Sequence, residues 1–178
     1  MEQTHHALPA NFGVRGKPGI RYLELKVNAG CSKRAAEFYK AQFGCGVAVD
    51  GAEANSAVAV GPNVNLLFTD ADADPEADAA MVGVHIAIYI TNYESVLNAL
   101  HSLNMTWTNP RFAYLDRCDT VAEALRCRQF RFKDLQDQDG GGGGGGGDDS
   151  GGKICELEHE TRSLTHAQFM KHVVYVSK

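Results

Sequence analysis

The sequence lacks the features that mark a membrane, secreted or nucleic-acid-binding protein. No apolar run approaches the ~20 residues that a membrane-spanning helix requires. The first residues, MEQTHHALPANFG, have neither the basic start nor the apolar stretch of a signal peptide. Basic residues form no concentrated patch, and the formal net charge is -5. We therefore expect a cytosolic protein with no nucleic-acid or membrane partner.

Paired cysteine motifs are also lacking. The chain has 5 cysteines, an odd number, and no two of them form a Cys-x-x-Cys pair. This pattern excludes a disulfide framework and a thiolate zinc site, and it indicates free thiols in a reducing compartment. The five are Cys31, Cys45, Cys118, Cys127 and Cys155.

The composition is that of an ordinary globular protein. The chain has 178 residues, of which 44% are hydrophobic and 22% are charged. This length supports one domain, or two fused half-domains, with a sizeable core. Residues 1–18 show no periodicity and are interpreted as a flexible N-terminal arm.

A first structural unit is predicted over residues 19–70. In IRYLELKV, Leu23, Leu25 and Val27 alternate with polar neighbours, which is typical of a half-buried strand. A helix follows, with Ser32 as its predicted N-cap and Gly44 as its end. Its predicted apolar face is Ala35, Ala36, Phe38, Tyr39 and Phe43. Three short strands are expected over 46–49, 54–60 and 64–69.

An acidic segment, residues 71–81, separates this unit from the next. Its spaced aspartates resemble a calcium-binding loop. However, Pro75 stands where the turn glycine of such a loop belongs, and the twelfth position is Met81. We interpret the segment as a solvated linker.

The same order of elements is predicted again over residues 82–161. The strand GVHIAIYIT places its valine and isoleucines on one face and His85 on the other. A helix capped by Asn92 follows, and its predicted core stripe is Val96, Leu97, Leu100 and Leu103. Strands are expected over 105–108, 122–133 and 154–160. Strand, helix and three strands thus occur twice, which predicts an α+β fold.

A glycine-rich run, QDQDGGGGGGGGDDSGGK, joins the last two predicted strands. A phosphate-binding loop is excluded, because Ile154 stands where Ser or Thr should hold magnesium and a strand follows instead of a helix. Lengthening a two-residue turn to about sixteen residues costs roughly 2 kcal/mol of closure entropy. A domain stable by roughly 5–15 kcal/mol tolerates that cost. We expect residues 135–152 to be a disordered insert.

Three stretches in this order resemble the vicinal oxygen chelate superfamily, which includes glyoxalase I, bleomycin-resistance proteins and extradiol dioxygenases. They are AAEFYKAQFGCGV, VHIAIYI and FRFKD followed after the insert by GGKICELEHE. The resemblance covers residues 20–161 apart from the insert. It implies two βαβββ modules in tandem that form a curved mixed β-sheet cleft with helices outside.

The resemblance also implies a divalent metal, Fe, Mn, Ni or Zn, that chelates two neighbouring oxygens of a small substrate. His85 and Glu156 fall on ligand positions of the second module. The first module departs from the pattern, with Tyr22 at the usual His or Gln position and Asn65 or Asn63 at the usual Glu position. Glu24 shares the face of Tyr22 and is a candidate third ligand. Glu24 and Glu156 are the candidate acid or base groups.

Simpler interpretations stand beside these. His85 and Glu156 could form a buried hydrogen bond without a metal, and Glu24 could pair with Lys26.

Substrate-binding candidates are two tyrosines and two arginines. Tyr22 and Tyr89 would line the cleft, although ordinary packing also accounts for them. Arg126 and Arg128 alternate on a predicted strand and would hold an anionic substrate, unless that face is a solvated edge. The remaining histidines are expected at the surface: His5, His6, His101, His159, His166 and His172.

Three classes of function stay open from the sequence. The first is a metal-dependent lyase, isomerase or dioxygenase. The second is a metal-free protein that binds a small molecule, as bleomycin-resistance proteins do. The third is a catalytically degenerate relative. The C-terminal tail, residues 162–178, would cover a sheet edge or form a dimer contact, so both a monomer and a homodimer are considered.

Overall fold

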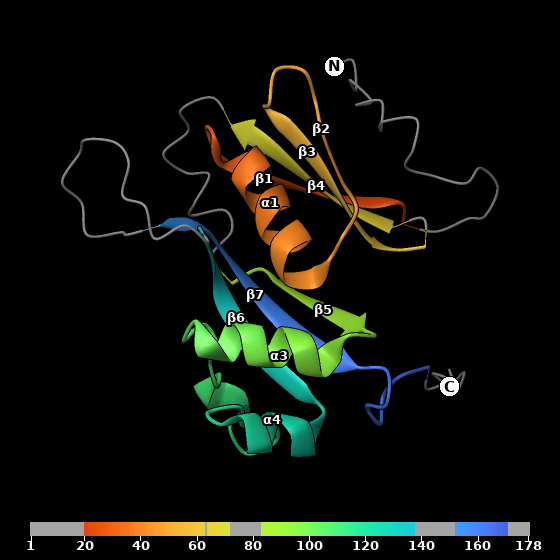
Figure 1. The fold of residues 1–178 in the computed structure, drawn as a ribbon, viewed down its shortest axis with the longest axis vertical. Helices are drawn as coiled ribbons and strands as arrows, with labels where there is room; N and C mark the ends of the chain where they lie inside the picture. The colour runs from red at the N-terminus through yellow and green to blue at the C-terminus, as the bar shows by residue number, and fades with distance from the viewer. Residues whose placement is uncertain (1–19, 63, 72–82, 138–151, 171–178) are drawn as a thin grey trace, which may run out of the picture. The chain divides into compact units, whose positions relative to one another are not determined.

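The computed structural model describes residues 20–62, 64–71, 83–137 and 152–170 (Figure 1). The chain divides into two compact units. The first comprises residues 1–84 and 134–157, and the second comprises residues 85–133 and 158–178. The predicted α+β class is confirmed, with a four-stranded and a three-stranded sheet. The arm, most of the acidic linker, the glycine run, Asn63 and the end of the tail lie outside the described residues.

The first unit has the predicted order of strand, helix and three strands. Its elements are β1 (Tyr22–Asn28), α1 (Cys31–Phe43), β2 (Val47–Val49), β3 (Asn55–Gly61) and β4 (Val64–Ala71). The strands lie in the order β1-β4-β3-β2. The sheet is mixed, because β1 pairs with β4 in parallel whereas β3 pairs with β4 and β2 in antiparallel.

Helix α1 packs through the predicted apolar face, and all five of those side chains are buried. The ring centroids of Tyr39 on the helix and Phe68 on β4 are 5.7 Å apart. Gly44 ends the helix in the left-handed conformation at φ 69, which glycine adopts without a Cβ clash.

The predicted N-cap of α1 is wrong. Gly30 occupies the N-cap position, and the Ser32 hydroxyl donates instead to the carbonyl of Glu53 at 3.0 Å. The Asp70 carboxylate accepts from the backbone N–H of Gly30 at 2.7 Å and of Ser32 at 2.8 Å. Asp70, which is distant in sequence, therefore supplies the hydrogen-bond acceptors for the backbone N–H groups at the start of the helix. The spacing of residues near the helix does not reveal this partner.

The second unit keeps the predicted opening strand and helix but departs from the pattern afterwards. Its elements are β5 (His85–Ile90), α3 (Tyr93–Ser102), the 3-10 helix η1 (Pro110–Phe112) and α4 (Val121–Cys127), with the first part of β6 (Gln129–Gln136) and the last part of β7 (Lys153–Ser163). The remaining residues of β6 and β7 belong to the first unit. The strand order is β5-β7-β6, so the glycine run joins two neighbouring strands as predicted.

Two predicted strands of this unit are wrong in part. Residues 105–108 form only an isolated bridge between Thr106 and Phe132. Residues 121–127 are helical, because the Thr120 side chain accepts from the Glu123 backbone and Glu123 reaches back to Thr120. This capping box starts a helix where an extended segment was expected.

The apolar side of the second sheet carries the core. Val96, Leu97 and Leu100 of α3 are buried there as predicted, whereas Leu103 ends the helix and is exposed. His159 of β7 is fully buried, and its ring stacks on Phe132 with centroids 4.0 Å apart. The expectation of a surface His159 is therefore wrong.

All five cysteines are free thiols. Among the residues that the structure describes, no helix is both long enough and apolar enough to traverse a bilayer.

We predict that Asp70→Ala lowers the free energy of unfolding by about 1 kcal/mol, because two N–H groups of the first helical turn lose their acceptor. Urea denaturation measures the change. Glu37→Gln, at an exposed position of the same helix, is the control and should change stability by less than about 0.5 kcal/mol. Equal effects of the two variants would contradict the assigned cap.

Candidate functional site

One face of the β5-β7-β6 sheet is lined by polar side chains. The parallel register pairs His85 with Glu158, Ala87 with Glu160 and Tyr89 with Arg162. Directly paired residues of neighbouring strands point to the same side, so these six share one face. Gln129 and Arg131 of β6 contact residues of this set and extend it. We call these eight residues the polar face.

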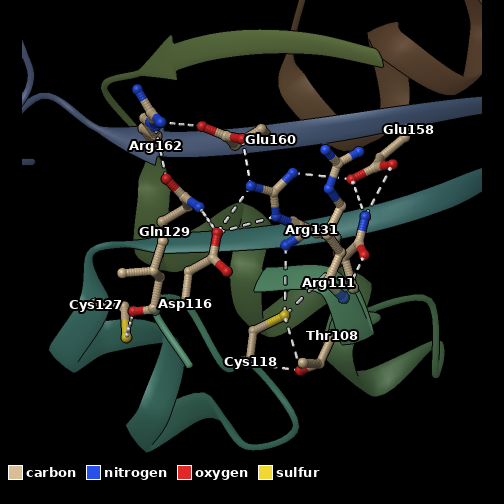
Figure 2. Close-up of polar contacts among 12 residues, drawn as sticks. Thr108, Arg111, Asp116, Cys118, Cys127, Gln129, Arg131, Glu158, Glu160 and Arg162 are labelled. Carbon is tan, nitrogen blue, oxygen red and sulfur yellow. Dashed lines mark hydrogen bonds and ion pairs between the residues drawn. The ribbon is translucent and has the colours of Figure 1, made fainter. Parts of the chain in front are cut away.

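Arg131 lies at the centre of the polar face (Figure 2). Its Nε and Nη2 donate to Oδ2 of Asp116 at 3.0 and 2.8 Å. Its Nη1 donates to Oε1 of Glu158 at 2.9 Å, and Nη2 also donates to Glu160. One guanidinium thus holds three carboxylates, two from β7 and one from the connection between α3 and α4.

A second guanidinium closes the network. Arg162 pairs with Glu160 and donates through Nε to Gln129 Oε1 at 2.6 Å (Figure 2). Its Nη1 donates to the Tyr89 hydroxyl at 3.0 Å. The Gln129 amide nitrogen donates in turn to Asp116. Every side chain of the network is therefore oriented by at least one neighbour, which preorganises the face.

The connection between α3 and α4 folds over the β6 side of the polar face. Asn109 donates to Glu158 Oε1 at 3.1 Å, and the Phe112 ring lies 4.8 Å from the Arg131 guanidinium carbon. Asp116 belongs to the same connection. Cys118 anchors its end, because its thiol accepts from the Arg131 backbone N–H at 3.5 Å.

The network is buried and carries more negative than positive groups. Arg131 is 4% exposed, Asp116 7% and Glu160 8%. Burial lowers the pKa of Arg131, but hydrogen bonding to Asp116 and the charge of Glu160 outweigh it, so that this pKa is raised above its ordinary value. Two guanidiniums face three carboxylates, and Asp116 Oδ1 is buried without a hydrogen-bond partner.

The β5 side of the polar face is open. His85 and Ala87 are exposed. Glu158 lies next to them and keeps 17% of its side chain exposed. Its Oε1 accepts from both Arg131 and Asn109, whereas its Oε2 accepts from Asn109 over a longer distance of 3.4 Å. A carboxylate oxygen with spare acceptor capacity thus borders the exposed strip.

The structure corrects the local conformation predicted for the two candidate substrate-binding arginines. Arg126 lies in helix α4, and Arg128 is its C-cap at φ 57, so the strand alternation assumed for them is wrong. Arg128 donates to the Thr165 carbonyl. Tyr89 does lie on the polar face, where its ring contacts Phe169 with centroids 5.1 Å apart.

The predicted residues of the first unit lie on β1. Glu24 and Tyr22 share one side of the strand as predicted, with Leu67 and Asn65 of β4 as their register partners. The Glu24 carboxylate accepts from the Thr69 hydroxyl at 3.1 Å. Tyr22 is 37% exposed.

Glu156 and His85 complete the predicted set. The Glu156 carboxylate lies 3.6 Å from the Lys153 ammonium. His85 begins β5, on the side opposite the isoleucines, as predicted.

A divalent metal would need several of these ligands together. Within residues 20–62, 64–71, 83–137 and 152–170, no three side chains of His, Cys, Asp or Glu form a group that could hold a metal ion. The carboxylates of the network form ion pairs with the guanidiniums of Arg131 and Arg162. Their negative charges are thus neutralised largely by groups of the same chain.

Sequence reasoning missed the centre of this network. The alternation in CELEHETR and QFRF was a usable signal, because it puts Glu158, Glu160, Arg162 and Arg131 on one face of two neighbouring strands. Asp116 gave no such signal, because it lies in an irregular connection without periodicity.

We predict that Arg131→Met lowers the free energy of unfolding at neutral pH by about 3–5 kcal/mol, because buried carboxylates lose their counter-ion. Urea denaturation measures the loss. Arg126→Met removes an exposed arginine of the same unit and should cost less than about 0.5 kcal/mol. A loss below about 1 kcal/mol in the Arg131 variant would contradict the central role of this guanidinium.

The segment after β7 provides a pH test. Burial lowers the pKa of His166, and the nearby Arg162 charge lowers it further. Its Nδ1 accepts the Gln168 N–H at 3.1 Å, which requires a neutral acceptor nitrogen. The folded state thus binds the proton less tightly than the unfolded state, and stability from this contact should fall as pH drops below 6.5.

We therefore expect an NMR titration of the His166 ring to give a pKa below 6.5, with the ring contact to Tyr89 weakening over the same range. In His166→Gln the Tyr89 signals should not follow that titration. A His166 pKa above 6.5 would contradict the assigned environment.

The chain was compared with known proteins. No family model matches the sequence, and no curated protein sequence matches it. Solved structures do match. Oxidase ChaP-H2 is 14% identical with a TM-score of 0.47, covering 85% of this chain and 98% of that one. A protein from Bacillus anthracis assigned to the glyoxalase family is 14% identical with a TM-score of 0.45, covering 84% and 99%.

Lactoylglutathione lyase from Agrobacterium tumefaciens is 13% identical with a TM-score of 0.40, covering 82% of this chain and 94% of that one. These similarities concern the fold alone.

Proposed function

We propose that this chain is a metal-free protein that binds a small molecule at the polar face of its second sheet. The observation that carries the proposal is the Arg131 network. Its guanidinium engages Asp116, Glu158 and Glu160 at once, so the charges on this face are balanced largely within the chain.

The network supports binding because it is rigid and only partly covered. Small-molecule sites combine a fixed set of polar groups with apolar or aromatic walls. Here the guanidiniums and carboxylates orient one another, and the rings of Tyr89 and Phe112 lie over Arg162 and Arg131. The exposed His85 and Ala87 leave the β5 side accessible.

The proposal favours the second of the three classes considered from the sequence. A glyoxalase-like or dioxygenase-like enzyme with a divalent metal and a vicinal-oxygen substrate would require His85, Glu156 and a further ligand to meet. Balanced carboxylates reduce the electrostatic gain that a divalent ion would obtain on the polar face.

Metal analysis of protein purified without a histidine tag tests the proposal. We expect less than about 0.1 equivalent of Fe, Mn, Ni or Zn, and a thermal midpoint that a chelator leaves unchanged. A small-molecule thermal-shift screen run with and without chelator should return the same ligands. The double variant His85→Ala, Glu156→Ala is the control.

Stoichiometric metal that disappears in the double variant would overturn the proposal and support the metal-dependent enzyme. A chelator-resistant protein for which no small molecule raises the thermal midpoint would also overturn it, and would support the degenerate relative.

A further inference from the structure

We infer that the open side of the polar face recognises an organic cation, an amidinium or ammonium group, through Glu158. This inference rests on the proposed function, since it names the class of ligand for the same face. The inferred ligand has the opposite charge to the one that the sequence suggested, because Arg126 and Arg128 were expected to hold an anionic substrate.

The arginines of the polar face have their donors engaged. Arg131 donates through Nε, Nη1 and Nη2 to three carboxylates. Arg162 donates to Gln129 and Tyr89 and pairs with Glu160. An anionic ligand would have to displace a buried carboxylate from one of them, which leaves that carboxylate desolvated and unpaired. The face is therefore poorly suited to an anion.

The acceptors of the polar face are not equally engaged. Three carboxylates share two guanidiniums, so the network retains negative charge. Asp116 is 7% exposed and its Oδ1 has no hydrogen-bond partner, although its Oδ2 accepts from both Arg131 and Gln129. This buried, unsatisfied oxygen shows that donors are short within the cluster itself.

Glu158 is the carboxylate through which a ligand would reach this negative charge. It lies at the boundary between the buried network and the exposed strip of His85 and Ala87. Its Oε1 is engaged by Arg131 and Asn109, and Oε2 receives the long contact from Asn109. A cationic N–H donor placed over Ala87 would donate a charge-assisted hydrogen bond to Oε2 of Glu158.

Ala87 leaves room for such a group. Its small side chain is exposed and pairs in register with Glu160, next to the pair of His85 and Glu158. The exposed imidazole of His85 provides a planar wall on one side and the Tyr89 ring lies two positions further along β5. A flat cation such as an amidinium fits this strip, because it can lie beside the planar His85 ring and present N–H donors to the Glu158 carboxylate.

Three matched probes test the inference: benzamidinium, neutral benzamide and anionic benzoate. Binding is followed by NMR shifts of the β5 and β7 amides at low ionic strength. We expect saturable shifts with benzamidinium, and an affinity at least tenfold above that for the other two. Salt at about 0.5 M should weaken the binding, since the site is partly exposed.

Two variants locate the site. Glu158→Gln should weaken benzamidinium binding at least tenfold, whereas Glu94→Gln, an exposed carboxylate on helix α3, should leave it unchanged. Ala87→Lys would place an ammonium beside Glu158 and compete with the ligand without touching the network. It should abolish binding, whereas Ala87→Ser, which stays small and neutral, should retain it.

Equal affinity for the three probes, or retained binding in Glu158→Gln and Ala87→Lys, would overturn the inference. So would binding of other small molecules at this face with no response to benzamidinium, an outcome that leaves the proposed function intact. Absence of any small-molecule binding would overturn both.

Discussion

The second unit depends on one guanidinium that holds three carboxylates. Arg131 comes from β6, Glu158 and Glu160 from β7, and Asp116 from the connection that folds over the sheet. Arg131, Asp116 and Glu160 are almost fully removed from water, so each relies on the others for its charge to be tolerated. The irregular connection, the polar face and the strand pair are therefore fixed together.

The same strands sort their side chains into two unlike layers. Toward the helices they present Phe130, Phe132 and the stacked ring of His159. Toward the other side they present the charged network, because successive side chains of a strand point to opposite faces. The core thus supplies the apolar burial, whereas the network concentrates charged groups on the opposite face.

In the first unit, local patterning predicted most of the fold. The alternation of β1 and the apolar spacing of α1 matched the structure, because half-buried elements must place apolar residues on one side. The second unit was predicted less well after α3. Residues 121–127 satisfy their backbone through a capping box, and residues 105–108 reach only one bridge, so an extended interpretation failed there.

The sequence by itself determined the alternation that puts His85, Glu158 and Arg131 on one face, since side-chain direction in a strand follows position. Only the tertiary structure decided what those charges do. Asp70 reaches α1, and Asp116 reaches Arg131, through contacts between segments far apart in the chain. Such partners depend on how the chain folds back on itself, and no local spacing encodes that.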